Sequence, residues 1–226
     1  MNISIVIPVF PPHFKHLDGC LKNIMESTML PKEIIIAASE MNNDSKDTLY
    51  NKLNQITNNL TTLIITNTEE KAFSGINRNR GVECSSGEII VFIDADDFTH
   101  RQKIEIIDYI FKKHLDCKML LHNYTKNNNF EISNYNLNNL NEFKYIGGFE
   151  KTDIVKNNMN TIHRGHSTIR KSVFDKVQFK NEMHREDNIF TKKVHKVFNS
   201  SYFVPIELMI YNETGIPFRE NYYKKD

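Results

Sequence analysis

The feature that most constrains the fold is an uninterrupted apolar run that ends in acidic residues. Residues Ile89 to Ile93 are all apolar and mostly β-branched, which is typical of a strand buried on both faces in an α/β sheet. Asp94, Asp96 and Asp97 follow this strand. Ligands of open α/β sheets bind beyond the carboxyl ends of the strands, so chemistry is expected here. Asp94 and Asp96 can turn toward one point, and their oxygens would suit Mg²⁺ or Mn²⁺, which would in turn hold a phosphate.

The same acidic turn has a simpler interpretation. Thr99 would be the N-cap of a helix, and Gln102 would complete a capping box before the apolar residues Ile104, Ile107 and Phe111. Taken alone, the Asp-x-Asp pattern favours this structural interpretation, because short motifs often match by chance.

Motifs that flank the acidic turn shift the balance toward function. Gly75 to Gly81 reads Gly-Ile-Asn-Arg-Asn-Arg-Gly, Ser86 to Glu88 precedes the strand, and Glu186 with Asp187 opens a later helix. In this order the segments resemble those of the family 2 glycosyltransferases of the GT-A fold. The resemblance runs from Ile3 to about Tyr211, and residues 75 to 97 are its most specific part. It implies an α/β fold of Rossmann-like type, with a mixed, mainly parallel central sheet flanked by helices.

The apolar pattern along the chain agrees with such a fold. Strand, helix and strand are predicted at Ile3 to Ile7, around Leu17 to Ile24, and at Glu33 to Ile36, and this β-α-β unit places both strands in one parallel sheet. We further predict a helix capped by Asp44 or Ser45, and expect little periodicity in the Asn-rich residues 126 to 142. The remaining predicted elements are strands at Leu63 to Ile65, Met119 to His122, Tyr202 to Val204 and Ile206 to Tyr211, and a helix over Ala72 to Cys84.

The resemblance also implies which residues bind the nucleotide. The loop after the first strand, with Pro8 and Phe10, is expected to touch it. The family's second strand ends in an aspartate that contacts the base, but here the segment is Ala37-Ala-Ser-Glu-Met41. Either Ser39 or Glu40 would have to take over that hydrogen bond. An equally good interpretation makes Ser39 a simple turn residue.

Arg78, Asn79, Asp94 and Ala95 are also expected to contact the nucleotide-sugar. A guanidinium near a pyrophosphate makes bidentate, charge-assisted hydrogen bonds. The alternative is an exposed helical Arg78 without contacts of note, but its place in the family-like segment favours phosphate or base contact. Arg80 is expected to be the exposed arginine of this helix.

A general base is the second requirement of the implied reaction. Transfer with inversion needs a carboxylate that removes the acceptor proton, and by resemblance Asp187 takes this role, with Glu186 as the alternative. A structural interpretation is that both acids simply favour a helix N-terminus. His163 and His166 have a spacing that metal ligands share, but without a nearby third ligand we expect structural roles, and retain only His166 as a possible substrate contact.

The sequence therefore predicts a metal-dependent, inverting glycosyltransferase with Mn²⁺ or Mg²⁺ held by Asp94 and Asp96. The donor would be a nucleotide-sugar, with UDP favoured, and the acceptor a hydroxyl of a glycan or similar molecule. A different class remains open: a non-catalytic nucleotide- or sugar-binding module with a degenerate GT-A fold, which the altered segment at residues 37 to 41 favours. A nucleotidyltransferase or a haloacid dehalogenase phosphatase fits less well, because their early motifs are not evident.

Composition supports an ordinary globular chain. The 226 residues suit one domain, with residues 1–98 expected to bind the nucleotide-sugar and residues 99–226 the acceptor. The net charge of +1 predicts no nucleic-acid partner. Three scattered cysteines favour a reducing compartment, and neither a secretory signal nor an integral membrane segment is evident, so we expect a cytoplasmic protein.

Overall fold

Parallel strands form the N-terminal half of a mixed sheet. The computed structural model describes residues 1–126, 134–145, 162–182 and 184–212. Within them the first four strands pair in parallel in the order β3-β2-β1-β4. Every residue of β1, β2 and β4 is buried, as their continuous apolar runs predicted. The bounds are Ile3–Val9 for β1, Glu33–Ala38 for β2, Thr62–Asn67 for β3 and Ile89–Phe92 for β4.

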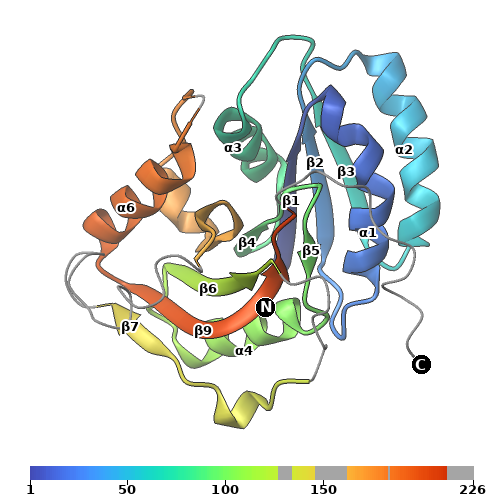
Figure 1. Cartoon of the computed structure of the whole chain (residues 1–226). Coiled ribbons are helices and arrows are strands. Elements are labelled where there is room, and N and C mark those ends of the chain that lie inside the picture. Colours follow the sequence, from blue (N-terminus) through green and yellow to red (C-terminus); the bar gives the residue numbers. More distant parts are fainter. Residues whose placement is uncertain (127–133, 146–161, 183, 213–226) are drawn as a thin grey trace.

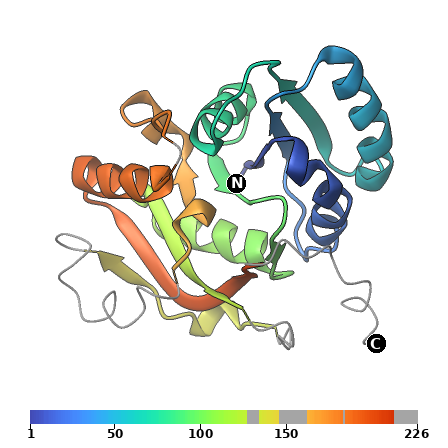
Figure 2. The ribbon, with the colours of Figure 1, turned by 45° about the horizontal axis from the view of Figure 1, so that its top comes forward.

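Helices cover both faces of this parallel half. Helices α1 (Leu17–Met25) and α2 (Asn43–Thr57) lie on one face, and α3 (Ser74–Cys84) lies on the other (Figures 1 and 2). All three helices were predicted. The predicted cap of α2 was wrong, because the side chain of Asn42, rather than Asp44 or Ser45, accepts the hydrogen bond from the Ser45 backbone N–H at 2.9 Å.

Alternating side chains of the strands divide the core into two clusters. Ile5 and Ile7 of β1 pack with residues of α1 and α2, whereas Val6 between them packs with Val82 of α3. Successive strand residues point to opposite faces of a sheet, so one buried strand supplies both clusters. Both faces of the sheet are therefore hydrophobic and both are covered.

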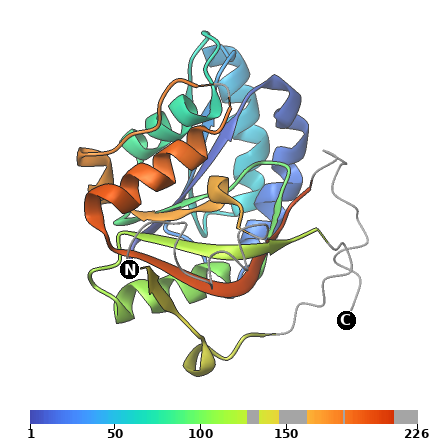
Figure 3. The same ribbon diagram turned by 60° about the vertical axis from the view of Figure 1, so that its left-hand side comes forward.

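The C-terminal half extends the same sheet mainly with antiparallel pairs. Strand β8 pairs antiparallel with β4, and the order continues β8-β6-β9-β5, with β7 beside β9. Strand β9 curves as it runs parallel beside β6 (Figure 3). The two strands predicted at Tyr202 to Val204 and Ile206 to Tyr211 are one, because β9 continues through Pro205. The bounds are Phe98–Thr99 for β5, Met119–Thr125 for β6, Phe143–Tyr145 for β7, Thr168–Arg170 for β8 and Ser201–Ile210 for β9.

Two further helices complete the described fold. Helix α4 (Lys103–Lys113) packs on the side of α1, and α6 (Glu186–Phe198) packs on the side of α3. Helix α6 begins at Glu186, as predicted. The capping box predicted at Thr99 is wrong, because Thr99 belongs to β5 and its backbone N–H donates to Asn23 at 2.7 Å, so α4 begins four residues later.

Two remaining features concern the Asn-rich stretch at residues 126 to 142 and the length of the helices. Residues 127–133 of the predicted irregular stretch lie outside the described residues, and the rest of it contains only the 3₁₀ turn Leu137–Asn139. None of the helices in the described ranges is long and apolar enough to cross a membrane.

Candidate active site

A pocket opens at the carboxyl end of the parallel strands, between the two halves of the sheet. Its volume is about 310 Å³. It gathers residues from the end of β1, the 3₁₀ helix Pro11–His16, helix α3, the turn after β4, the segment before β8, the start of α6 and the two residues after β9. The residues that line it are Pro8, His13, Ser74, Arg78, Asp94, Asp96, Asp97, His163, Gly165, Glu186, Asp187, Tyr211 and Asn212.

Arg78 joins the two acidic segments of the pocket. Its side chain is only 3% exposed, and its guanidinium lies 2.8 Å from Oδ1 of Asp94 and 2.9 Å from Oε1 of Glu186. Burial alone would raise the pKa of Asp94, but the Arg78 charge holds that pKa well below its usual range. The alternative of an exposed Arg78 is therefore wrong.

Close packing of α3 on the sheet brings Arg78 to this place. A Cβ on Gly81 would lie 2.4 Å from Cγ1 of Val6, so only glycine lets the helix approach β1 this closely. On the far side, the amide of Asn79 donates to the Phe179 carbonyl at 2.9 Å and accepts from its backbone N–H at 3.0 Å. Of the two residues predicted to bind the nucleotide-sugar from this helix, Arg78 lies at the pocket, whereas Asn79 is hydrogen-bonded to Phe179.

The acidic turn after β4 crowds three carboxylates. Ala95 is fully buried in the core, so Asp94 and Asp96 on either side of it face the pocket. Burial and the neighbouring Asp97 and Asp94 charges raise the pKa of Asp96. Burial and the Asp94 charge likewise raise the pKa of Asp97 to about 7. A bound cation would relieve this repulsion, and carboxylate oxygens are the donors that Mg²⁺ and Mn²⁺ prefer, so the residues present fit a divalent cation.

Three buried polar side chains, Lys103, His166 and Asp97, contact one another in sequence beneath the pocket surface and hold the acidic turn. Nζ of Lys103 lies 3.4 Å from Nδ1 of His166, and Nε2 of His166 lies 2.8 Å from Oδ2 of Asp97. The other Asp97 oxygen accepts the Asn212 backbone N–H at 2.7 Å. Burial and the Lys103 charge lower the pKa of His166, and burial lowers that of Lys103 to about 7, although Asp97 opposes the latter shift. A neutral His166 that accepts from Lys103 and donates to Asp97 satisfies both contacts.

This arrangement corrects the prediction for His166. Its side chain has no exposed surface, so it does not touch a substrate in the pocket. It instead connects α4 to the acidic turn.

The first turn of α6 brings two further carboxylates to the pocket. Arg185, directly before the helix, has a left-handed backbone with φ of 63°, which few residues other than glycine adopt. Glu186 then pairs with Arg78, while Oδ1 of Asp187 accepts the Asn188 backbone N–H at 2.6 Å. Both carboxylates line the pocket opposite the acidic turn.

Comparison with known proteins identifies the family of this chain. The family model described as glycosyl transferase family 2 matches residues 4–178. The chain belongs to glycosyl transferase family 2. The predicted family is thereby confirmed.

Individual proteins are similar to this family 2 chain in sequence or in fold. A poly(ribitol-phosphate) beta-glucosyltransferase of Bacillus spizizenii is 33% identical over 100 residues, which are 43% of this chain and 15% of the relative. S. aureus TarS 1-349 in complex with UDP-GlcNAc superposes with a TM-score of 0.72 at 15% identity, covering 100% of this chain and 62% of that TarS fragment. The mannosyltransferase PcManGT from Pyrobaculum calidifontis, in complex with GDP-Man and Mn²⁺, gives 0.68 at 12% identity, covering 97% and 58%.

These neighbours are GT-A glycosyltransferases, so the predicted GT-A fold is confirmed. In each of the three comparisons the chain spans less than two thirds of the other protein's length.

The structure divides the residues that the family 2 resemblance selected. Six of them line the pocket: Pro8, Arg78, Asp94, Asp96, Glu186 and Asp187. Five lie outside the pocket lining: Phe10, Ser39, Glu40, Asn79 and Ala95. Ser39 is fully buried, and its hydroxyl donates to the Ala72 carbonyl at 3.2 Å, whereas Glu40 is exposed in a left-handed conformation with φ of 56°. Arg80, expected to be exposed, is half-buried and donates to the Ala38 carbonyl.

Several pocket residues were not selected from the sequence. Tyr211 and Asn212 reach the pocket because β9 pairs with β5, which follows the acidic turn directly. No local pattern indicates that pairing. His163 has a signal in its spacing from His166, but Asp94, which the structure brings close to both, lies far away in the sequence.

Proposed function

We propose that this chain is a metal-dependent, inverting glycosyltransferase that moves a sugar from a UDP-sugar to a hydroxyl group. The observation that carries the proposal is the pocket in which Arg78 joins the acidic turn to the paired acids of α6. Residues 1–98 would bind the donor and residues 99–226 would bind the acceptor. The GT-A fold and the family 2 match support the proposed glycosyl transfer.

The donor diphosphate would lie against the acidic turn. Asp94 and Asp96 would hold Mn²⁺ or Mg²⁺, which when bound supplies positive charge for the leaving diphosphate. Arg78 orients Asp94 and lines the same pocket, so its guanidinium can also approach a phosphate. S. aureus TarS is known in complex with UDP, and PcManGT in complex with GDP-Man and Mn²⁺, which supports a nucleotide-sugar donor and a metal.

Asp187 would act as the general base. It would remove the acceptor hydroxyl proton as the oxygen attacks the sugar carbon from the face opposite the nucleotide. Glu186 is the weaker choice, because its carboxylate already pairs with Arg78 at 2.9 Å.

The acceptor would be a hydroxyl-rich chain. The curated relative is named for a poly(ribitol-phosphate) acceptor, and it shares 33% of residues with this chain over the matched 100. We extend that acceptor class, a polyol phosphate polymer, to this protein.

One observation favours a second function, a nucleotide- or sugar-binding module without turnover. The acidic residue expected after the second strand is replaced, and the hydroxyl of Ser39 is engaged by Ala72 and Asn77 inside the protein. A module of this kind would bind a nucleotide without transferring a sugar.

Thermal unfolding with UDP, GDP, dTDP and CMP, each with Mn²⁺ and again with EDTA, tests the donor. A ligand that binds only the folded state stabilises it by about 2.7 kcal/mol at a hundredfold excess over Kd. We expect a shift with UDP that EDTA abolishes, followed by transfer from a UDP-sugar. A shift without transfer from any UDP-sugar would favour a nucleotide-binding module, whereas no shift with any nucleotide would contradict the proposed transferase and favour a degenerate module that binds a sugar.

A further inference from the structure

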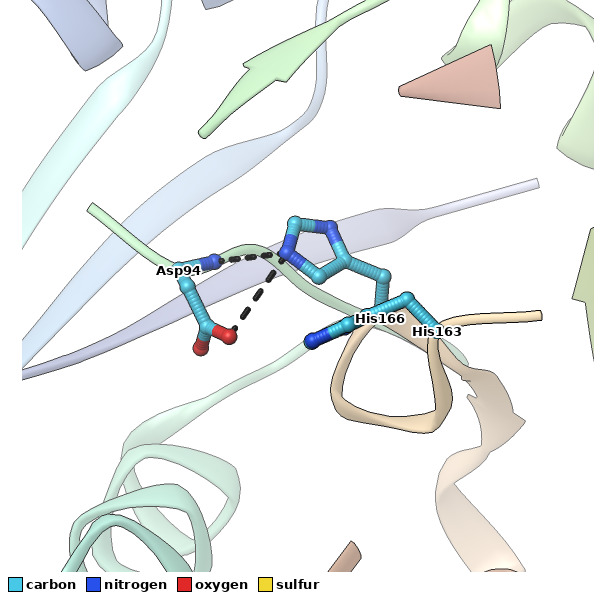
Figure 4. A group of neighbouring side chains, drawn as sticks. All are labelled: Asp94, His163 and His166. Atoms are coloured by element: carbon cyan, nitrogen blue, oxygen red, sulfur yellow. Dashed lines mark hydrogen bonds and ion pairs between the residues drawn. The ribbon is translucent and has the colours of Figure 1, made fainter. Parts of the chain in front are cut away.

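Asp94, His163 and His166 form a compact group beside the pocket. One potential ligand atom from each lies within 4.8 Å of the others. Figure 4 shows the rings of His163 and His166 on the same side of the Asp94 carboxylate. Only two of these residues line the pocket, Asp94 and His163.

His166 is already committed to other contacts. One ring nitrogen faces the Asp97 carboxylate at 2.8 Å and lies 3.3 Å from the Asp94 backbone nitrogen, and the other faces Lys103 at 3.4 Å. The ring is completely buried. A ligand must offer a free lone pair to the metal, so His166 supports the group without joining it.

His163 differs from His166 in each respect. It lines the pocket, and its Nδ1 is enclosed without a hydrogen-bond partner among the described residues. Its ring packs against Tyr211, with centroids 4.7 Å apart, and edge-on against Tyr124 at 6.0 Å. Buried polar atoms rarely lack a partner, so a ring that is held in place by aromatic neighbours but has an unpaired nitrogen calls for a ligand.

Gly165 keeps the space between His163 and Asp94 open. A Cβ at this position would lie 2.9 Å from Cε1 of His163 and 3.2 Å from Oδ2 of Asp94. Figure 4 shows a ring nitrogen of His163 directed toward the Asp94 carboxylate, and a nitrogen of His163 lies within 4.8 Å of an Asp94 carboxylate oxygen. The Oδ2 atom is the Asp94 oxygen that Arg78 leaves free, because Arg78 binds Oδ1.

The geometry points to His163 as a nitrogen ligand of the divalent cation, beside the carboxylate of Asp94. This inference rests on the proposed metal dependence and extends it to a residue and to a metal preference. Mg²⁺ takes oxygen ligands almost exclusively, whereas imidazole suits transition metals. A site that combines carboxylates with His163 should therefore bind Mn²⁺ in preference to Mg²⁺.

Metal titration of the full chain in the absence of nucleotide tests this role. Mn²⁺ binding is measured by the electron paramagnetic resonance signal of the free ion, for the wild type, His163→Gln and His114→Gln. His114 is the control, because it lies at the end of α4, outside both the pocket lining and the ligand group. We expect His163→Gln to weaken Mn²⁺ binding about tenfold or more and Mg²⁺ binding much less, and His114→Gln to stay within about twofold of the wild type.

A spectroscopic measurement on the wild type covers the case in which His163→Gln does not fold. Electron spin echo modulation of bound Mn²⁺ should show a directly coordinated nitrogen, and that signal should persist in His114→Gln. Unchanged Mn²⁺ affinity in folded His163→Gln, or no nitrogen coupling in the wild type, would overturn the inference while leaving metal-dependent transfer intact. If the wild type transferred sugar equally well with EDTA and bound no Mn²⁺, the metal dependence and this inference would both be overturned.

Discussion

The two ends of the parallel sheet both bury carboxylates, but they stabilise them differently. At the amino end, Glu33 is 4% exposed and accepts hydrogen bonds from the Ser4 hydroxyl at 2.6 Å and from the Ser86 backbone and hydroxyl at 2.5 and 2.9 Å. Although burial opposes ionisation, these hydrogen bonds lower the pKa of Glu33. Its charge is fully paired with neutral donors inside the protein.

The carboxyl end does not stabilise all of its carboxylates in this way. Asp94 pairs with Arg78, and Asp97 is hydrogen-bonded to His166 and Asn212, but burial and the charges of neighbouring carboxylates still raise the pKa of Asp96 and Asp97. Within one sheet, the amino end is thus built for stability, whereas the carboxyl end keeps groups that are unfavourable without a ligand. Such perturbed groups in a pocket are typical of functional sites.

The largest expected effect is on catalysis at the carboxyl end. Asp187→Asn removes the proposed base but keeps the size of the side chain, so transfer should fall by about 10²- to 10⁴-fold. Donor binding, measured by the UDP-induced thermal shift, should be nearly unchanged because Asp187 does not contact the acidic turn in the described contacts. Asp96→Asn is the matched comparison, and it should weaken metal-dependent UDP binding. Equal weakening of UDP binding by both substitutions would contradict this separation of roles.

The next largest effect is expected on the stability of the fold, when the positive charge of Arg78 between the two acidic segments is removed. Arg78→Met would leave Asp94 and Glu186 without their shared partner, and removing one member of a buried ion pair costs about 3 kcal/mol or more. The free energy of unfolding in urea measures this cost.

Arg80→Met is the control for that experiment. Arg80 lies one residue beyond Asn79 on the same helix but donates only to neutral oxygens of Ala38 and Asn77, so its removal should cost about 1 kcal/mol. Similar losses for the two variants would mean that the ion pairs of Arg78 add little beyond ordinary hydrogen bonds.

The parts of the fold that were predictable have local causes. The strand at Ile89, the parallel pair of β1 and β2, and the start of α6 at Glu186 follow from apolar runs and helix signals within a few residues. The acidic turn was predictable as a site because strand ends are where ligands bind.

The parts that were not predictable depend on distant contacts. Lys103 lies in an amphipathic helix where lysine is normally exposed, yet it is 1% exposed because His166 and Asp97 come from other segments to meet it. Thr99 was expected to cap a helix, but Asn23 from α1 holds it in a strand. In both cases tertiary contacts overrule the local preference.

At the amino end, the corresponding substitution should reduce stability alone. Glu33→Gln removes the charge and one acceptor oxygen, so the Ser86 hydroxyl loses its partner, at a cost of about 1 to 2 kcal/mol at neutral pH. Metal and UDP binding should not change, because this end of the sheet lies away from the pocket lining.

The pH dependence of that loss provides its own check. The folded protein lowers the pKa of Glu33, so the stabilisation is present above the usual value near 4.5 and is lost as the pH falls through the folded pKa. The difference in unfolding free energy between wild type and Glu33→Gln should therefore shrink below about pH 4.5. A difference that is constant from pH 7 to pH 3 would show that the charge of Glu33 contributes nothing.

The smallest expected effect is a gain rather than a loss of stability. It tests most directly the difference between the two ends of the sheet. Asp96→Asn removes a charge that its neighbours disfavour, so without metal the variant should be as stable as the wild type or more stable, by about 1 kcal/mol at most. With saturating Mn²⁺ the order should reverse, because the wild type gains more stability from the bound cation than the variant does. Thermal unfolding with EDTA and with Mn²⁺ measures both values. If Asp96→Asn lost stability without metal as Glu33→Gln does, the acidic turn would be a structural feature like the amino end, and the difference between the two ends of the sheet would disappear.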